Sequence, residues 1–282
     1  MTNARDLFRR YLSQQVALGR SLVTLPNRPG VAAPPHVAPA DSPPAAPATA
    51  SPAKVPATAP RTGRGRREAP RWDTDLPPIP PAGIVIPAPD SDLFAADPLA
   101  GATLDAVVAQ IHACTHCGLH AGRANAVPGE GPADARLVVV GEGPGANEDR
   151  LGRPFVGRAG DLLNEILAAI DCPRETVYIA NVVKCRPPDN RKPLGEEMEA
   201  CMPYLHRQLA LIRPKVVLAM GATAAEALLH TRGSLGQLRN RVHDYRGIPL
   251  IVTYHPAALL RNPNWKRPTW DDVRIARQLL DR

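Results

Sequence analysis

Four apolar runs, each about the length of a β-strand, alternate with helical segments over the second half of this 282-residue chain. In chain order they are RLVVVGE (136–142), TVYIANVVK (176–184), KVVLAMG (215–221) and IPLIVTYHP (248–256). Strands that are apolar throughout are typical of parallel sheets whose two faces are covered by helices. The alternation therefore predicts a three-layer α/β/α sandwich with a central four-stranded, mainly parallel sheet.

Helices are predicted between and around these runs. Their segments are 103–114, 162–170, 198–212, 222–230 and 269–281. In 162–170 and 198–212, apolar residues recur at the spacing of one helix face. Thr103 precedes the first segment and is the residue type that caps a helix N-terminus.

Proline divides the chain into parts. Of 33 prolines, 19 lie between Pro26 and Pro98, mixed with alanine, serine and threonine. Such a composition buries too little apolar surface to offset the entropy lost on ordering. We therefore expect a short N-terminal helix over 1–22, a disordered Pro/Ala-rich linker over 23–102 and one folded domain over 103–282. A chain beginning near Leu99 should then contain the whole domain.

The charges leave two interpretations open. The net charge is +7, and basic residues gather in KCRPPDNRK, RGSLGQLRNR and RNPNWKR, as on a phosphate-contacting surface or on an ordinary solvated one. No run reaches transmembrane length, and charges such as Arg9 and Arg10 interrupt the first segment, unlike a signal peptide. We expect a cytoplasmic monomer without membrane contact, whose N-terminal helix docks an unidentified protein partner.

The segment GEGPGANEDRLGRPFVGRAG (141–160) places six glycines between the first strand and the next helix. Glycine lets the backbone approach a bound group closely, and a helix N-terminus presents free N–H groups. In open α/β sheets, ligands bind at such strand-to-helix loops. The loop therefore predicts a ligand site without identifying the ligand.

Four of the five cysteines form a group with the spacing C-x2-C, a gap of 67 residues, then C-x15-C: Cys114, Cys117, Cys185 and Cys201. Four thiolates suit tetrahedral zinc or a cubane iron–sulfur cluster, and the spacing does not separate the two. The alternative is an incidental pair and two buried thiols. Cys172 has no place in the group and is expected to be an ordinary thiol.

Three motifs and this cysteine spacing resemble the family 4 uracil-DNA glycosylases, bacterial and archaeal enzymes that contain a [4Fe-4S] cluster. The motifs are GEGPGANEDRLGRPFVGRAG, NVVKCRPPDNRKP and YHPAALLRNP. The resemblance covers roughly residues 103–282. It implies a DNA repair hydrolase that flips uracil out of single- or double-stranded DNA and hydrolyses its N-glycosidic bond, leaving an abasic site. It also implies a cluster held by Cys114, Cys117, Cys185 and Cys201.

The resemblance assigns uracil binding to Glu142, Gly143, Phe155, Asn181 and His255. The ring of Phe155 would stack on the base. The Asn181 carboxamide would donate to uracil O4 and accept from N3–H. His255 would donate to O2, where negative charge develops as the bond breaks.

The catalytic candidates are Glu142, Glu148 and His255. Gly143 stands where the best-known glycosylase family has an aspartate that activates water. Glu142 is therefore the first candidate for ordering the attacking water, and Glu148 is the second.

DNA contacts are predicted in YHPAALLRNPNWKR (254–267). Leu259 is the candidate wedge for the space left by the flipped base, and Arg261 and Lys266 are expected on phosphates.

Two other functions fit parts of the pattern. One is a uracil-DNA binding protein that captures or crosslinks the site without turnover. The related group with that property carries a basic insertion after the second strand, which NVVKCRPPDNRKP lacks. The other is a structural iron–sulfur module of the replication machinery, which would have no need of an intact pocket.

Overall fold

The computed structural model describes residues 71–88, 99 and 101–282. These residues belong to one unit of the chain, Gly65–Arg282. The predicted helix over 1–22 and much of the predicted linker lie outside the described residues.

The described residues form an α/β fold around one mostly parallel sheet, as predicted, but the sheet has six strands instead of four. The strands are β1 (Ala82–Ile86), β2 (Leu137–Gly141), β3 (Tyr178–Asn181), β4 (Val216–Met220), β5 (Val242–Tyr245) and β6 (Ile248–Thr253). Their order is β1-β5-β6-β4-β2-β3, and only the β5·β6 pair is antiparallel. The four predicted strands correspond to β2, β3, β4 and β6.

The two additional strands lie together at one edge of the sheet. β5 and β6 form a hairpin that turns at Arg246 and Gly247, both at positive φ. β1 pairs with β5 in parallel and lies inside the segment 23–102, so the predicted linker is wrong at this point. The reason is that five residues, AGIVI, are enough for an edge strand but hardly alter the composition of a proline-rich stretch.

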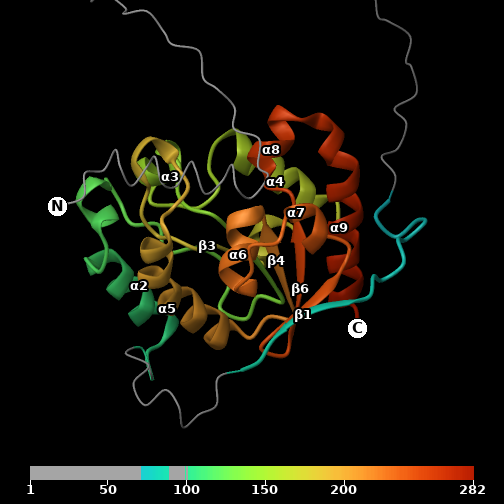
Figure 1. The fold of residues 1–282 in the computed structure, drawn as a ribbon, viewed down its shortest axis with the longest axis horizontal. Helices are drawn as coiled ribbons and strands as arrows, with labels where there is room; N and C mark the ends of the chain where they lie inside the picture. Colours follow the sequence, from blue (N-terminus) through green and yellow to red (C-terminus); the bar gives the residue numbers. More distant parts are fainter. Residues whose placement is uncertain (1–70, 89–98, 100) are drawn as a thin grey trace, which may run out of the picture. The chain divides into compact units, whose positions relative to one another are not determined.

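The chain just before β1 also packs on the domain. Trp72 Nε1 donates to Asp171 Oδ2 at 2.5 Å, and Arg274 Nε donates to the Trp72 carbonyl at 2.8 Å. Gln278 Nε2 donates to the Pro77 carbonyl at 3.0 Å. The folded domain therefore begins well before residue 103, and a chain beginning near Leu99 would lack one strand of its sheet (Figure 1).

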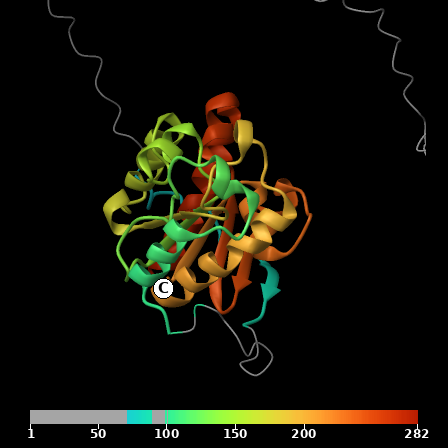
Figure 2. The same ribbon diagram turned by 90° about the vertical axis from the view of Figure 1, so that its left-hand side faces the viewer.

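Helices cover both faces of the sheet (Figures 1 and 2). They are α2 (Leu104–Ala113), α3 (Ala146–Leu151), α4 (Arg158–Ala168), α5 (Gly195–Ile212), α6 (Ala222–Leu229), α7 (Leu235–Leu238), α8 (Pro256–Arg261) and α9 (Lys266–Leu280). Thr103 caps α2 as predicted, since its Oγ1 accepts from Ala106 N at 3.3 Å. No helix among the described residues is long and apolar enough to cross a membrane.

Alternate residues of each strand point to opposite faces and fill two separate cores. Val138 and Val140 pack with apolar residues of α2, α5 and α6. Leu137 and Val139 pack with apolar residues of α4 and α9. Because β3, β2, β4 and β6 are neighbours and mutually parallel, their carboxyl ends meet at one edge, where open α/β sheets build their sites.

Candidate functional site

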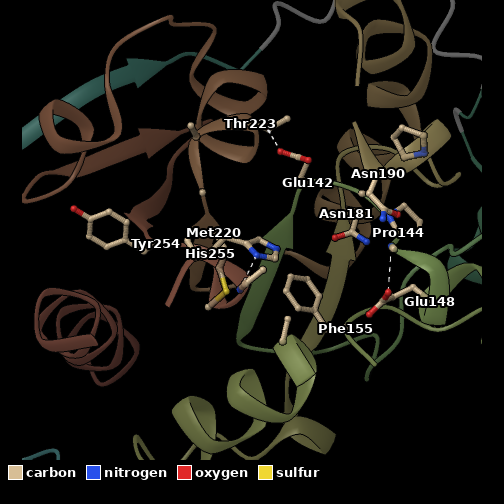
Figure 3. A pocket seen from close by; sticks show the side chains of 18 of the residues that line it. Glu142, Pro144, Glu148, Phe155, Asn181, Asn190, Met220, Thr223, Tyr254 and His255 are labelled. Carbon is tan, nitrogen blue, oxygen red and sulfur yellow. Dashed lines mark hydrogen bonds between the residues drawn. The ribbon is translucent and has the colours of Figure 1, made fainter. Parts of the chain in front are cut away.

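A cavity of about 770 Å³ opens at the carboxyl ends of β2, β3, β4 and β6. It brings together residues that are far apart in the chain, and Figure 3 shows them facing one another. All predicted uracil-binding and catalytic residues line it: Glu142, Gly143, Glu148, Phe155, Asn181 and His255. Thr223 and Tyr254, which sequence reasoning did not single out, line it as well.

The carboxamide of Asn181, the last residue of β3, faces the cavity. Gly141 pairs with Asn181 in register, and a Cβ on Gly141 would lie 2.5 Å from Asn181 Oδ1 and 2.6 Å from Phe155 Cζ. Only glycine permits both side chains to lie this close to the backbone. Asn181 is 2% exposed, and its carboxamide has no hydrogen-bond partner in the described part of the chain. Its donor and its acceptor are therefore left for a ligand.

Phe155 is held in an unusual backbone conformation, with φ at +49°. Arg174 supports it by donating to the Phe155 carbonyl at 3.0 Å and to the Pro154 carbonyl at 2.6 Å. The same guanidinium is paired with Glu130. Gly160 is required beneath the turn, because a Cβ there would lie 1.9 Å from the Phe155 carbonyl oxygen. These contacts fix the ring at the cavity wall.

His255 is a neutral hydrogen-bond donor in this site. Its Nδ1 accepts from Ala257 N at 3.2 Å at the start of α8, which leaves the proton on Nε2. Burial, with a smaller effect of the Arg261 charge, lowers the pKa of His255 to about 4. The ring stacks on Phe155 with 5.2 Å between centroids. His255 thus offers an N–H without a positive charge.

Glu142 and Glu148, the two glutamates of the glycine loop, differ in their hydrogen-bond partners. Glu142 Oε2 accepts from Thr223 Oγ1 at 2.5 Å, and Oε1 has no hydrogen-bond partner in the described part of the chain. Both oxygens of Glu148 are engaged by backbone, since they accept from Gly145 N at 3.1 Å and from Val156 N at 2.9 Å. Glu142 therefore has acceptor capacity left for water, whereas Glu148 is occupied in holding the loop.

The predicted DNA-contacting segment divides into buried and exposed residues. Arg261 and Lys266 are exposed, and Arg261 lines the cavity. Leu259 is 1% exposed, because α8 turns it into the protein, so the structure does not place it where a wedge would enter DNA. Its neighbour Leu260 is 39% exposed. The i, i+1 relation on a helix puts the two leucines on different faces.

An aromatic pair at the cavity rim was not predicted. Tyr254 stacks on Trp265 with 4.8 Å between centroids and 5° between planes. The Arg239 guanidinium lies over the Tyr254 ring, 4.6 Å from its centroid. The tyrosine precedes His255 in the YHP motif, so adjacency to a site residue was the only signal in the sequence.

The four grouped cysteines line one small cavity beside α5. Three N–H groups donate to their sulfurs: His116 N to Cys114 at 3.5 Å, an Arg123 guanidinium nitrogen to Cys185 at 3.0 Å, and Lys184 N to Cys201 at 3.3 Å. No group of three or more His, Cys, Asp or Glu side chains in the described ranges is arranged to hold a metal ion. Four thiols on one cavity, with N–H donors to sulfur, are nevertheless a donor set that fits a four-thiolate cluster.

Burial affects the ionisable groups around these cysteines. It raises the pKa of the Cys201 thiol to about 12, so a bound metal would have to displace that proton. It lowers the pKa of Lys184 to about 8. Cys172, which lies in the other core with α4 and α9, is separate from the group.

Comparison with known proteins agrees with this geometry. A model of the uracil DNA glycosylase superfamily matches residues 128–275. The chain is 48% identical over 158 residues to a type-4 uracil-DNA glycosylase of Pyrobaculum aerophilum, covering 53% of this chain and 81% of the relative. It is 44% identical over 181 residues to a type-4 uracil-DNA glycosylase of Thermotoga maritima, covering 63% and 94%. A type-5 uracil-DNA glycosylase of Thermus thermophilus is 35% identical over 156 residues, covering 47% and 69%. With its cavity at the ends of the parallel strands, the chain belongs to the uracil DNA glycosylase superfamily.

Proposed function

We propose that this chain is a DNA repair enzyme that flips uracil out of DNA and hydrolyses its N-glycosidic bond. The observation that carries the proposal is the free Asn181 carboxamide, which shares one cavity with the Phe155 ring and the His255 N–H. Membership of the superfamily and the type-4 relatives support the same activity.

The chemistry requires stabilisation of separated charge, because the base leaves as an anion and the sugar becomes cationic. The Asn181 carboxamide would donate to uracil O4 and accept from N3–H, with the base on the Phe155 face. The Nε2–H of His255 would donate to O2. A neutral donor suits this position, because its hydrogen bond strengthens as negative charge develops on the oxygen.

The attacking water would be held by Glu142. Its Oε1 is available, while Thr223 fixes Oε2 and so the direction of the carboxylate. We assign Glu148 to the loop that carries Gly145 and Val156, since both of its oxygens are already used there. A Cβ on residue 143 would lie 2.7 Å from Val183 Cγ2, and Gly143 avoids this contact.

A [4Fe-4S] cluster is the proposed cofactor, held by Cys114, Cys117, Cys185 and Cys201. When bound, it would link the end of α2, the segment after β3 and α5 by metal–thiolate bonds and so stabilise this side of the domain. The Arg123 and Lys184 N–H groups would donate to its cysteine sulfurs.

DNA would bind across the cavity mouth in single- or double-stranded form. Arg261 and Lys266 would contact phosphates, and Leu260, the exposed leucine of α8, takes the place of Leu259 as the proposed wedge. The five free cysteines suit the reducing cytoplasm, where we propose that the chain acts as a monomer.

The test is an assay for abasic sites. Purified protein is incubated with a labelled oligonucleotide that contains one uracil, and alkali then cleaves at any abasic position. Cleavage at uracil, with none in a matched thymine oligonucleotide, is expected. Tight binding to uracil DNA without release of base would instead identify a capture protein.

A further inference from the structure

Lys184 is a buried cation whose partners are neutral. The residue is 1% exposed. Its Nζ donates to the Asn181 carbonyl at 2.8 Å and to Gln208 Oε1 at 2.7 Å. No ion pair between Lys184 and a carboxylate is present in the described part of the chain. Burying an ammonium is costly unless an anion compensates it, so these contacts leave its charge unbalanced.

The four grouped cysteines lie close enough to Lys184 to supply the missing negative charge. Lys184 lines the same small cavity as Cys114, Cys117, Cys185 and Cys201. Its backbone N donates to Cys201 Sγ, and Cys185 is the next residue in the chain. A cubane cluster with four thiolate ligands is an anion overall, so a cluster bound here would compensate the ammonium.

The other contacts of Lys184 lead to the uracil site. The Asn181 carbonyl that it holds belongs to the residue whose carboxamide faces the large cavity. Gln208 continues the network, donating to the Pro128 carbonyl at 2.9 Å and to Tyr178 Oη at 3.0 Å. Both ends of β3 are thus anchored by a single buried network around one ammonium.

We propose that Lys184 is a positioning residue that couples the two sites. Its ammonium takes its counter-charge from the cluster thiolates and in return fixes the main chain of Asn181. The proposal rests on the cofactor and on the reading of uracil by Asn181 proposed above. Loss of the cluster would then disturb the uracil pocket although no cysteine lines it.

The first test compares Lys184→Met with Tyr178→Phe in protein purified without oxygen. Lys184→Met keeps the length of the side chain but removes its charge, whereas Tyr178→Phe removes a neutral hydroxyl from the same network. Lys184→Met should release iron to a chelator at least about tenfold faster than the parent and lose about tenfold in kcat/KM on uracil DNA. Tyr178→Phe should stay within about twofold of the parent in both measurements.

The outcomes test the counter-charge role and the coupling to Asn181 separately. Iron release at the parental rate in Lys184→Met would overturn the counter-charge role. Faster release with parental kcat/KM in the cluster-loaded variant would overturn the coupling to Asn181. If the parent itself removes no uracil, the proposed function fails, but iron release still tests the counter-charge.

A second test needs no variant and so does not depend on the folding of Lys184→Met. Hydrogen exchange is followed in the parent before and after iron is removed by a chelator. Peptides covering 178–184 should lose protection, while those covering 216–220, in β4, should keep it. Equal protection of 178–184 with and without iron would overturn the proposal.

Discussion

Thr223 Oγ1 donates a 2.5 Å hydrogen bond to Glu142 Oε2, joining the first turn of α6 to the loop after β2 across the cavity. Thr223 is 4% exposed, so water does not readily replace this bond. If Glu142 orders the attacking water, Thr223 sets its direction. We predict that Thr223→Val lowers the rate of uracil excision about tenfold, roughly 1.4 kcal/mol. Single-turnover kinetics on a uracil oligonucleotide measure the effect.

Thr223→Ser keeps the hydroxyl and is the matched control, expected within about threefold of the parent. A double-mutant cycle with Glu142→Gln separates this role from a structural one. In the Glu142→Gln background, Thr223→Val should have little further effect. Full additivity of the two losses would show that Thr223 acts independently of Glu142.

The protonation of His255 predicts a specific dependence of stability on pH. Its folded pKa, about 4, lies below its ordinary value of 6.5, because burial and the Arg261 charge disfavour the imidazolium. Between these values the unfolded chain binds a proton that the folded chain does not. The stability from this group is therefore complete above about pH 6.5 and is lost as the pH falls toward 4.

We predict that the free energy of unfolding falls between pH 7 and pH 5 by roughly 2 kcal/mol more in the parent than in His255→Gln. Urea unfolding at the two pH values measures this. The single-turnover rate of the parent should also show no inflection near pH 6.5 that can be assigned to His255. Identical pH dependence of stability in parent and variant would mean that His255 titrates normally.

The two leucines of α8 should behave in opposite ways. Leu260→Ala should lower uracil excision from duplex DNA about tenfold and leave single-stranded DNA nearly unaffected, because only a duplex leaves a gap when its base is flipped. Leu259→Ala should destabilise the fold by about 2 kcal/mol or more, since it empties buried space. Excision assays on both substrates, with thermal melts, distinguish them. If a well-folded Leu259→Ala protein lost more excision activity on duplex DNA than Leu260→Ala, Leu259 would be the wedge residue.

The cofactor proposal predicts colour and iron content. Protein purified without oxygen should be brown with about four irons for each chain. Cys114→Ala and Cys201→Ala should lose colour and solubility, whereas Cys172→Ala, in the other core, should keep both. Iron analysis and absorption spectra test this. Zinc in place of iron, or equal loss of iron in Cys172→Ala, would contradict the assignment.

The strands that form long apolar runs could be predicted from the sequence, whereas short strands and strands with polar residues could not. The runs that became β2, β3, β4 and β6 are apolar throughout, and their parallel arrangement places their loops at one edge. β1 and β5 were not predicted, for different reasons. AGIVI is five residues inside a proline-rich stretch, and VHDY has two consecutive polar residues at its centre, so neither forms a long apolar run.

The residues of the candidate site could be predicted from the sequence, but their protonation, hydrogen-bond partners and burial could not. The motifs identified Asn181 and His255, whereas the Nε2–H tautomer is assigned from a hydrogen bond that only the structure reveals, from Ala257 N to Nδ1. It also separates Glu142 from Glu148 by their partners, and Leu259 from Leu260 by burial. Such distinctions depend on contacts between segments far apart in the chain, which local sequence patterns do not record.

Asn181 provides the most direct test of the account, by single-turnover excision from one uracil oligonucleotide with the parent and with Asn181→Asp. The ionised aspartate can only accept hydrogen bonds, so it repels uracil O4 where the carboxamide would donate. The account predicts a rate at least about a hundredfold lower in the variant, roughly 2.7 kcal/mol of lost transition-state stabilisation. A folded, iron-containing Asn181→Asp protein that removes uracil at the parental rate would show that Asn181 does not read the base.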